Sequence, residues 1–241
     1  MRARPAVTVT FAQSLDGCLA AEPGRPLALS SPEALAYTHR LRASHAALLV
    51  GLGTVLADNP RLTVRHAAGP NPQPVILDSH LRCPPQAALL RHPTHRLWIA
   101  ARADALLAPG AEGERRAQRA AALTEAGAVI IPLPADAQGR VSLPALLDEL
   151  GRRGLASLMV EGGAQVITAF LTQGLAERLI VTIAPRLLGG VHALAAPLDL
   201  ALREAQYRVL GQDLIVEARV DGRRQTRDDE SSSVVRRPSS T

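Results

Sequence analysis

The segment Leu158-Met159-Val160-Glu161-Gly162-Gly163-Ala164-Gln165-Val166 lies where the chain changes from strand to helix, and it indicates the class of the fold. Residues 155–160 form a short apolar run that is typical of a buried strand. After the two glycines, Val166, Ile167 and Phe170 fall at helical spacing, so a helix follows directly. Glycine has no Cβ atom, so a ligand can lie against the backbone, and the free N–H groups at a helix N-terminus attract anions. The segment therefore predicts a phosphate or pyrophosphate site, with a tight turn without a ligand as the alternative.

Glu161 adds a carboxylate to this turn. It follows a strand expected at the centre of the sheet, and open α/β sheets bind ligands outside the carboxyl ends of their strands. A carboxylate repels a phosphate, so we expect it to bind another group, such as a substrate amide or amine. The alternative is an acidic cap at the start of the helix.

The composition limits the classes of function. The 241 residues, 47% of them hydrophobic, are enough for one good core and predict one folded domain over residues 1–221. All 27 basic residues are arginine, which excludes a catalytic lysine. The net charge is +5, but there is no basic stripe with interleaved aromatic residues, so an anionic small ligand is expected and nucleic acid is not. Two cysteines, no metal-ligand spacing and no apolar span predict a cytoplasmic protein without a metal or a membrane segment.

Strands and helices alternate along most of the chain, which predicts an α/β fold with a mostly parallel twisted sheet flanked by helices. A loop is expected at 19–29, and the polar, serine-rich residues 222–241 are expected to be disordered. Two strands at 205–210 and 214–220 predict a C-terminal antiparallel hairpin at the sheet edge. The other expected strands are 6–12, 46–50, 74–79, 96–100, 127–131, 155–160 and 177–184, and the expected helices include 32–44, 112–126 and 142–152.

A second change from strand to helix occurs at Gly51-Leu52-Gly53-Thr54, where the Thr54 hydroxyl could reach a phosphate or an amide. A structural turn is the simpler interpretation of that motif alone. Arg61 and Arg65 follow in a polar turn and could bind a phosphate in bidentate fashion, or could lie in a solvated loop. Ser79, at the end of another strand, could hold a ribose 2′-phosphate together with Arg82.

Five motifs, in this order and spacing, resemble the reductase domain of riboflavin biosynthesis. The resemblance covers about residues 6–220. The motifs are Ser14-Leu15-Asp16-Gly17, Leu41-Arg42-Ala43 with Val50 to Thr63, Leu77-Asp78-Ser79, Val160-Glu161-Gly162-Gly163, and Ile183 to Gly190.

This resemblance implies a dihydrofolate-reductase-like fold and an enzyme that uses NADPH to reduce the ribosylamino group of a phosphorylated pyrimidine to ribitylamino. It also implies a homodimer formed through edge strands. The implied substrate-binding residues are Arg42, Leu62, Arg65 and Glu161, with the arginines at the phosphate. The implied NADPH-binding residues are Ala12, Gln13, Thr54, Asp58 and Ser79, together with Gly162, Gly163, Ala164, Gln165 and Val166. The last five belong to a turn that runs from Gly162 to Ala169.

The implied reaction is hydride transfer from nicotinamide C4 to ribose C1′, in which the protein supplies mainly proximity and orientation. Glu161 and Asp58 are the candidate catalytic acids. A related reductase of another substrate, such as dihydrofolate, and a non-catalytic dinucleotide-binding module are the alternatives.

The chain departs from bifunctional bacterial members of the family at two positions. Thr10 stands where they carry a lysine, and Ala28 stands where many carry a tryptophan. The zinc signature of a deaminase domain is absent, as in members with a stand-alone reductase. Whether the substrate is the deaminated dione or the 2,5-diamino compound stays open.

Overall fold

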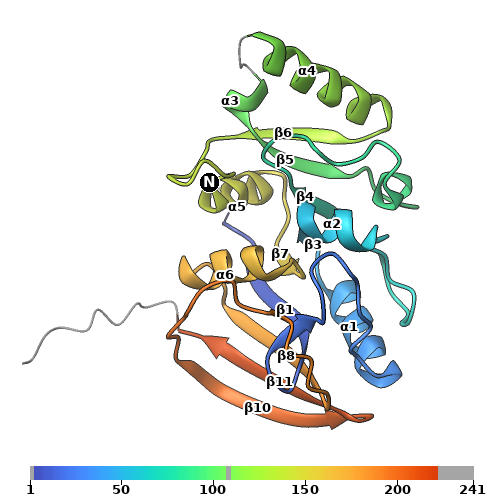
Figure 1. The fold of residues 1–241 in the computed structure, drawn as a ribbon, viewed down its shortest axis with the longest axis vertical. Helices are drawn as coiled ribbons and strands as arrows, with labels where there is room; N and C mark the ends of the chain where they lie inside the picture. The colour runs from blue at the N-terminus through green and yellow to red at the C-terminus, as the bar shows by residue number, and fades with distance from the viewer. Residues whose placement is uncertain (1–2, 107–109, 222–241) are drawn as a thin grey trace, which may run out of the picture.

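The computed structural model describes residues 3–106 and 110–221, which form one large sheet with helices on both faces (Figure 1). Within these residues the order of strands is β10-β11-β8-β1-β7-β3-β4-β5-β6. A separate small sheet pairs β2 (Cys18–Ala20) with β9 (Val191–His192). The strands of the large sheet are β1 (Ala6–Ser14), β3 (Ala47–Gly51), β4 (Gln73–Leu77), β5 (Trp98–Arg102), β6 (Val129–Leu133), β7 (Ser157–Val160), β8 (Arg178–Ala184), β10 (Leu202–Leu210) and β11 (Asp213–Val220).

The sheet is parallel from β8 through β1, β7, β3, β4 and β5 to β6. The hairpin β10–β11 joins antiparallel to β8. This confirms the predicted mostly parallel sheet with an antiparallel C-terminal hairpin. Because the central strands are parallel, their carboxyl ends meet at one edge, which is where ligands of such sheets bind.

Helices cover both faces of the sheet. The helix α1 begins as its sequence predicts, because the Ser31 hydroxyl accepts a hydrogen bond from the Ala34 N–H and Pro32 occupies the first turn. The helices are α1 (Pro32–Ser44), α2 (Leu52–Asp58), α3 (Ala103–Leu106), α4 (Gly110–Glu125), α5 (Leu143–Arg152) and α6 (Ala164–Thr172), with a 3₁₀ turn at Ala88–Arg91.

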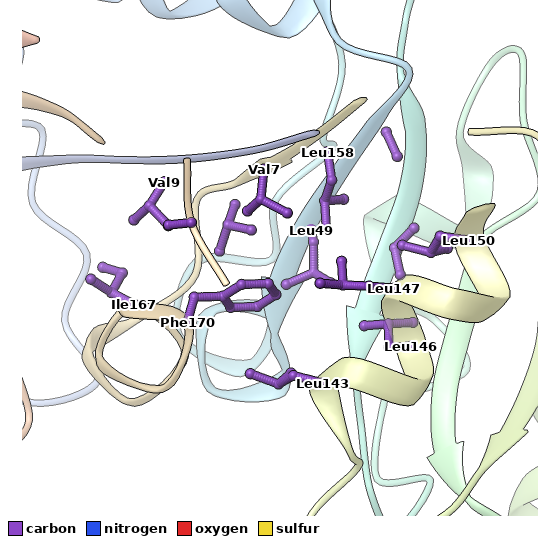
Figure 2. Close-up of a cluster of buried hydrophobic side chains, with 14 of the residues drawn as sticks. Val7, Val9, Leu49, Leu143, Leu146, Leu147, Leu150, Leu158, Ile167 and Phe170 are labelled. Carbon is purple, nitrogen blue, oxygen red and sulfur yellow. The ribbon is translucent and has the colours of Figure 1, made fainter. Parts of the chain in front are cut away.

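The core has two halves because alternate residues of a strand point to opposite faces. In β3, Leu49 packs under α5 and α6, whereas Leu48 and Val50 pack on the side of α1 and α2. Figure 2 shows the first half, where side chains of α5 and α6 meet those of β1, β3 and β7. The residues labelled there are Val7, Val9, Leu49, Leu143, Leu146, Leu147, Leu150, Leu158, Ile167 and Phe170.

The hairpin is tied to the start of α1. The Asp213 carboxylate accepts a hydrogen bond of 2.6 Å from the Ser31 N–H, and the Ser31 hydroxyl donates to the Leu210 carbonyl at 3.0 Å. The hairpin therefore fixes the first turn of α1, a helix that carries the site residue Arg42 further along.

The predicted loop at 19–29 is wrong at its first residues, because Leu19 and Ala20 belong to β2 and pair with β9. The predicted disordered tail, 222–241, lies outside the described residues. None of the described helices is long and apolar enough to cross a membrane.

Candidate functional site

A cavity of about 1370 Å³ opens at the carboxyl ends of β1, β3, β4 and β7. A site for one drug-sized ligand typically has about 300–1,000 Å³, so this cavity has room for two ligands together. The segment 20–30 and the turn 136–141 form other parts of its wall. Thr10 and Ala28 also line it.

Glu161 and Arg42 form a bidentate ion pair beside this cavity. Arg42 Nε donates to Glu161 Oε1 at 2.7 Å, and Arg42 Nη2 donates to Oε2 at 2.6 Å. The two side chains are only 14% and 13% exposed, so the pair is largely shielded from solvent. Burial alone lowers the pKa of Arg42, but the charge and hydrogen bond of Glu161 outweigh it and raise that pKa above its ordinary value. The guanidinium therefore stays charged, and its Nη1 also donates to the Thr63 carbonyl at 3.1 Å.

Arg65 and Arg61 differ in position, although both were candidates for a phosphate site. Arg65 lines the cavity, and its Nη1 donates to the Thr63 hydroxyl at 2.9 Å. Both arginines are exposed, but Arg61 is not part of the cavity wall. Leu62 lies between them in a left-handed backbone conformation (φ 52°), and its side chain is buried in the core, 1% exposed. The side chain of Leu62 is therefore not brought to the cavity, and its role at the substrate stays a prediction.

The glycines of the two strand-to-helix turns lie around Val166. A Cβ atom on Gly162 would lie 2.6 Å from the Val166 Cβ, and one on Gly51 would lie 2.8 Å from the Val166 Cγ2. Val166, rather than a ligand, is thus what a side chain at Gly51 or Gly162 would meet. Gly163 is different, because a Cβ there would contact only the Thr54 hydroxyl oxygen, at 3.4 Å. Gly163 is also the N-cap of α6 and offers no side chain to the first N–H groups of the helix, so it is the better place for an anion.

Replacing Gly162 by alanine should destabilise the fold by about 1–3 kcal/mol, the usual cost of an extra methyl group in a packed interior. Gly53→Ala is the matched control, because a Cβ at Gly53 has nothing within 4 Å. Urea unfolding of the two variants measures the difference. Combining Gly162→Ala with Val166→Ala should cost less than the sum of the single changes. Equal stability of the Gly162 and Gly53 variants would contradict this packing.

Several other predicted residues meet in the same cavity. Ala12, Thr54, Asp58, Ser79 and the turn 162–166 all line it. Gln13 does not. It follows Ala12 on β1, and successive side chains of a strand point to opposite faces, so Gln13 lines a separate small cavity. The predicted cofactor role of Gln13 therefore stays a prediction.

Asp58 is the last residue of α2 and is exposed on the cavity wall. Partial desolvation of its carboxyl raises the pKa above the ordinary value, because the charged form loses part of its hydration there. A carboxyl with a raised pKa is suited to hold and donate a proton. Glu161 is less suited, since both of its oxygens already accept hydrogen bonds from Arg42.

The turn after β6 contributes residues that the sequence did not suggest. Arg140 lines the cavity close to Ser79, whose hydroxyl oxygen accepts a hydrogen bond from the Val141 N–H at 3.2 Å. Asp136 shapes this turn by accepting from the N–H groups of Gln138 and Arg140, at 3.0 and 2.8 Å. An Asp three residues before a glycine was a local signal for the turn, but not for its contact with β4.

The Ser14–Gly17 motif stays outside the cavity wall. The Asp16 carboxylate accepts hydrogen bonds from the N–H groups of Leu188 (3.1 Å) and Gly189 (2.6 Å). The Ser14 hydroxyl and the Gly189 N–H lower the pKa of Asp16 to about 2. The Ser14–Gly17 motif thus binds the backbone of the Ile183–Gly190 motif, which is a structural role.

Comparison with known proteins places these motifs in one family. The model of the RibD C-terminal domain matches residues 5–216. A protein of Archaeoglobus fulgidus named 2,5-diamino-6-ribosylamino-4(3H)-pyrimidinone 5′-phosphate reductase is 41% identical over 109 residues, which is 41% of this chain and 50% of that protein. The chain spans half or less of the length of the curated relatives it matches.

Solved structures agree with this placement. The riboflavin biosynthesis reductase Rib7 of Saccharomyces cerevisiae superposes with a TM-score of 0.70 at 26% identity, over 90% of both chains. Dihydrofolate reductase of Enterococcus faecalis superposes with a TM-score of 0.51 at 13% identity, over 92% of this chain and 100% of that one. The predicted dihydrofolate-reductase-like fold is confirmed.

Proposed function

The chain belongs to the family of RibD C-terminal domains, and from this premise we propose that it is an NADPH-dependent reductase that converts the ribosylamino side chain of a pyrimidine 5′-phosphate to ribitylamino. The observation that carries the proposal is the single cavity that contains both the N-terminus of α6 and the Glu161–Arg42 pair with Arg65. One group of residues is suited to a dinucleotide and the other to a phosphorylated, hydrogen-bonding substrate.

The residues of the cavity fit NADPH. The α6 N-terminus at Gly163 presents N–H groups without a capping side chain, which suits the pyrophosphate. Thr54 lies beside that turn, and Asp58 lines the same cavity. Ser79 and Arg82 also line it and can hold a ribose 2′-phosphate. When bound, NADPH supplies the hydride.

The substrate residues act by orientation. Arg65 is the candidate for binding the phosphate, and two facts support it: Arg65 lines the cavity, and its guanidinium is not paired with a carboxylate in the described residues. The Glu161 carboxylate, held by Arg42, can accept hydrogen bonds from the amide or amino groups of the pyrimidine. Holding C1′ of the ring-opened substrate in one place is the main contribution to rate that such residues make. Asp58 is the candidate proton donor to the substrate nitrogen or oxygen.

The test follows NADPH absorbance with purified protein, in separate reactions with the dione and the 2,5-diamino ribosylamino phosphates. Oxidation with one of them supports the proposal and selects the substrate. Oxidation with dihydrofolate alone would make the chain a reductase of another substrate. Binding of NADPH without any turnover would leave the dinucleotide-binding module as the function.

We also expect a cytoplasmic homodimer formed through β10, the edge strand of the sheet. Tyr207 and Val209 on this strand are 68% and 69% exposed, which is unusual for apolar side chains of an edge. Light scattering should give twice the 25.5 kDa mass of the chain. A monomer at micromolar concentration would contradict this assembly.

A further inference from the structure

His39 is a buried histidine on α1 that none of the preceding functional assignments uses. It lies one turn before Arg42, so both side chains project from the same face of the helix. Its relative exposure is 0%. The His39 Nδ1 accepts a hydrogen bond of 2.9 Å from the backbone N–H of Arg65. Because a backbone N–H can only donate, Nδ1 carries a lone pair, and the proton of the neutral ring lies on Nε2.

Arg42 reaches the same segment from the other side. Its Nη1 donates to the Thr63 carbonyl at 3.1 Å, while its Nε and Nη2 hold Glu161. The His39 Nε2–H and the Arg42 Nη1 are 3.4 Å apart and are both donors, so they do not bond to each other. One turn of α1 thus binds the backbone of the 62–65 segment at two points, Thr63 and Arg65. The same turn also positions the Glu161 carboxylate, which follows β7.

We propose that His39 is a positioning residue, which holds the backbone of Arg65 so that the Arg65 guanidinium meets the phosphate of the substrate. This inference rests on the proposed function. A buried ring that merely filled the core would not need an acceptor directed at one backbone N–H. The bond matters because residues 62–65 form no regular secondary structure, and Leu62 has a left-handed backbone conformation (φ 52°).

The electrostatic surroundings keep this acceptor available. Burial, followed by the positive charges of Arg42 and Arg65 and the nearby His66, lowers the pKa of His39 to about 4. The groups that face the ring are therefore Arg42 on its own helix and Arg65 and His66 on the packed segment. The His66 ring lies edge-on at 4.8 Å between centroids. The ring is neutral at pH 7, and its protonation near pH 4 would turn Nδ1 into a donor and break the bond.

The experiment compares His39→Asn with His39→Leu. The two replacements have nearly the same shape, but only the asparagine amide oxygen can accept from the Arg65 N–H at the Nδ1 position. Relative to the Asn variant, the Leu variant should raise KM for the phosphorylated substrate about tenfold, because the partly buried Arg65 N–H is left without its partner. Its kcat should stay within about twofold and its Kd for NADPH should not change, since the chemistry and the cofactor site are untouched.

Two readouts separate this inference from the proposed function. If wild-type protein turns over neither pyrimidine, the proposed function fails. The positioning role is then measured through the affinity for ribose 5-phosphate, which should fall in the Leu variant and not in the Asn variant. Hydrogen exchange of the Arg65 amide should also be faster in the Leu variant. Equal KM or phosphate affinity in both variants, with equal exchange at Arg65, would overturn the inference.

Discussion

Glu161→Gln is expected to reduce kcat/KM by about 100-fold or more and to destabilise the fold by about 3 kcal/mol, because breaking one partner of a buried ion pair leaves the other charge uncompensated. The glutamine side chain keeps the shape of Glu161 but has only one oxygen for the two donors of Arg42, at 2.7 and 2.6 Å. One of those nitrogens would face the amide NH₂ group. The pair would loosen, and the acceptor for the pyrimidine would lose its charge.

Steady-state kinetics and urea unfolding measure the two effects. Glu112→Gln on α4 is the matched control, since that exposed carboxylate pairs with Arg115 and Arg116 at the surface. The Glu112→Gln change should lower the free energy of unfolding by less than about 1 kcal/mol and leave the kinetics unchanged. Adding Arg42→Gln to Glu161→Gln should recover part of the stability, because no unpaired charge remains, but none of the activity. Full activity of Glu161→Gln would contradict the central role of this pair.

Arg65→Ala is expected to raise KM for the phosphorylated substrate by about 10- to 100-fold, the loss that accompanies removal of a hydrogen bond to a charged group. The NADPH Kd should change little, because Arg65 lies beside the Glu161–Arg42 pair rather than at the α6 turn. Arg61→Ala is the control within the same segment, since Arg61 is exposed like Arg65 but lies outside the cavity wall. It should have no effect on KM beyond a weak long-range electrostatic one.

Comparison with a substrate analogue that lacks the phosphate sharpens this test. Wild-type protein should lose affinity for the analogue, whereas Arg65→Ala should bind substrate and analogue almost equally. If Arg61→Ala and Arg65→Ala raise KM by the same factor, the phosphate does not meet Arg65 specifically.

The fold could largely be predicted from the sequence because its signals are local. The apolar run before Glu161, the helical spacing after Gly163 and the Ser31–Pro32 helix start each depend on residues a few positions apart. The short strand β2 could not be predicted in the same way. Three residues carry too little pattern, and β2 exists only because Cys18 pairs with His192 far along the chain.

The sequence indicated many of the residues that line the candidate site, but not the contacts among them. Arg42 and Glu161 were both expected at the substrate, yet nothing in the sequence indicates that residues 119 positions apart pair with each other. Gly162 was expected to make room for a ligand, and the structure gives that space to Val166. Leu62 lies in a polar segment, but its left-handed backbone directs its side chain into the core. No local sequence motif predicts this conformation. These facts depend on tertiary packing, which sequence periodicity does not report.

The most direct test of the proposed reaction follows the hydride itself. NADPH carrying deuterium on one or the other face of nicotinamide C4 is supplied in separate reactions with the accepted pyrimidine phosphate, and the product is examined by mass spectrometry and NMR. We predict that one of the two labelled cofactors transfers its deuterium to C1′ of the ribityl chain, without loss to solvent. An unlabelled product from both cofactors, or a label at any other carbon, would contradict direct reduction at C1′.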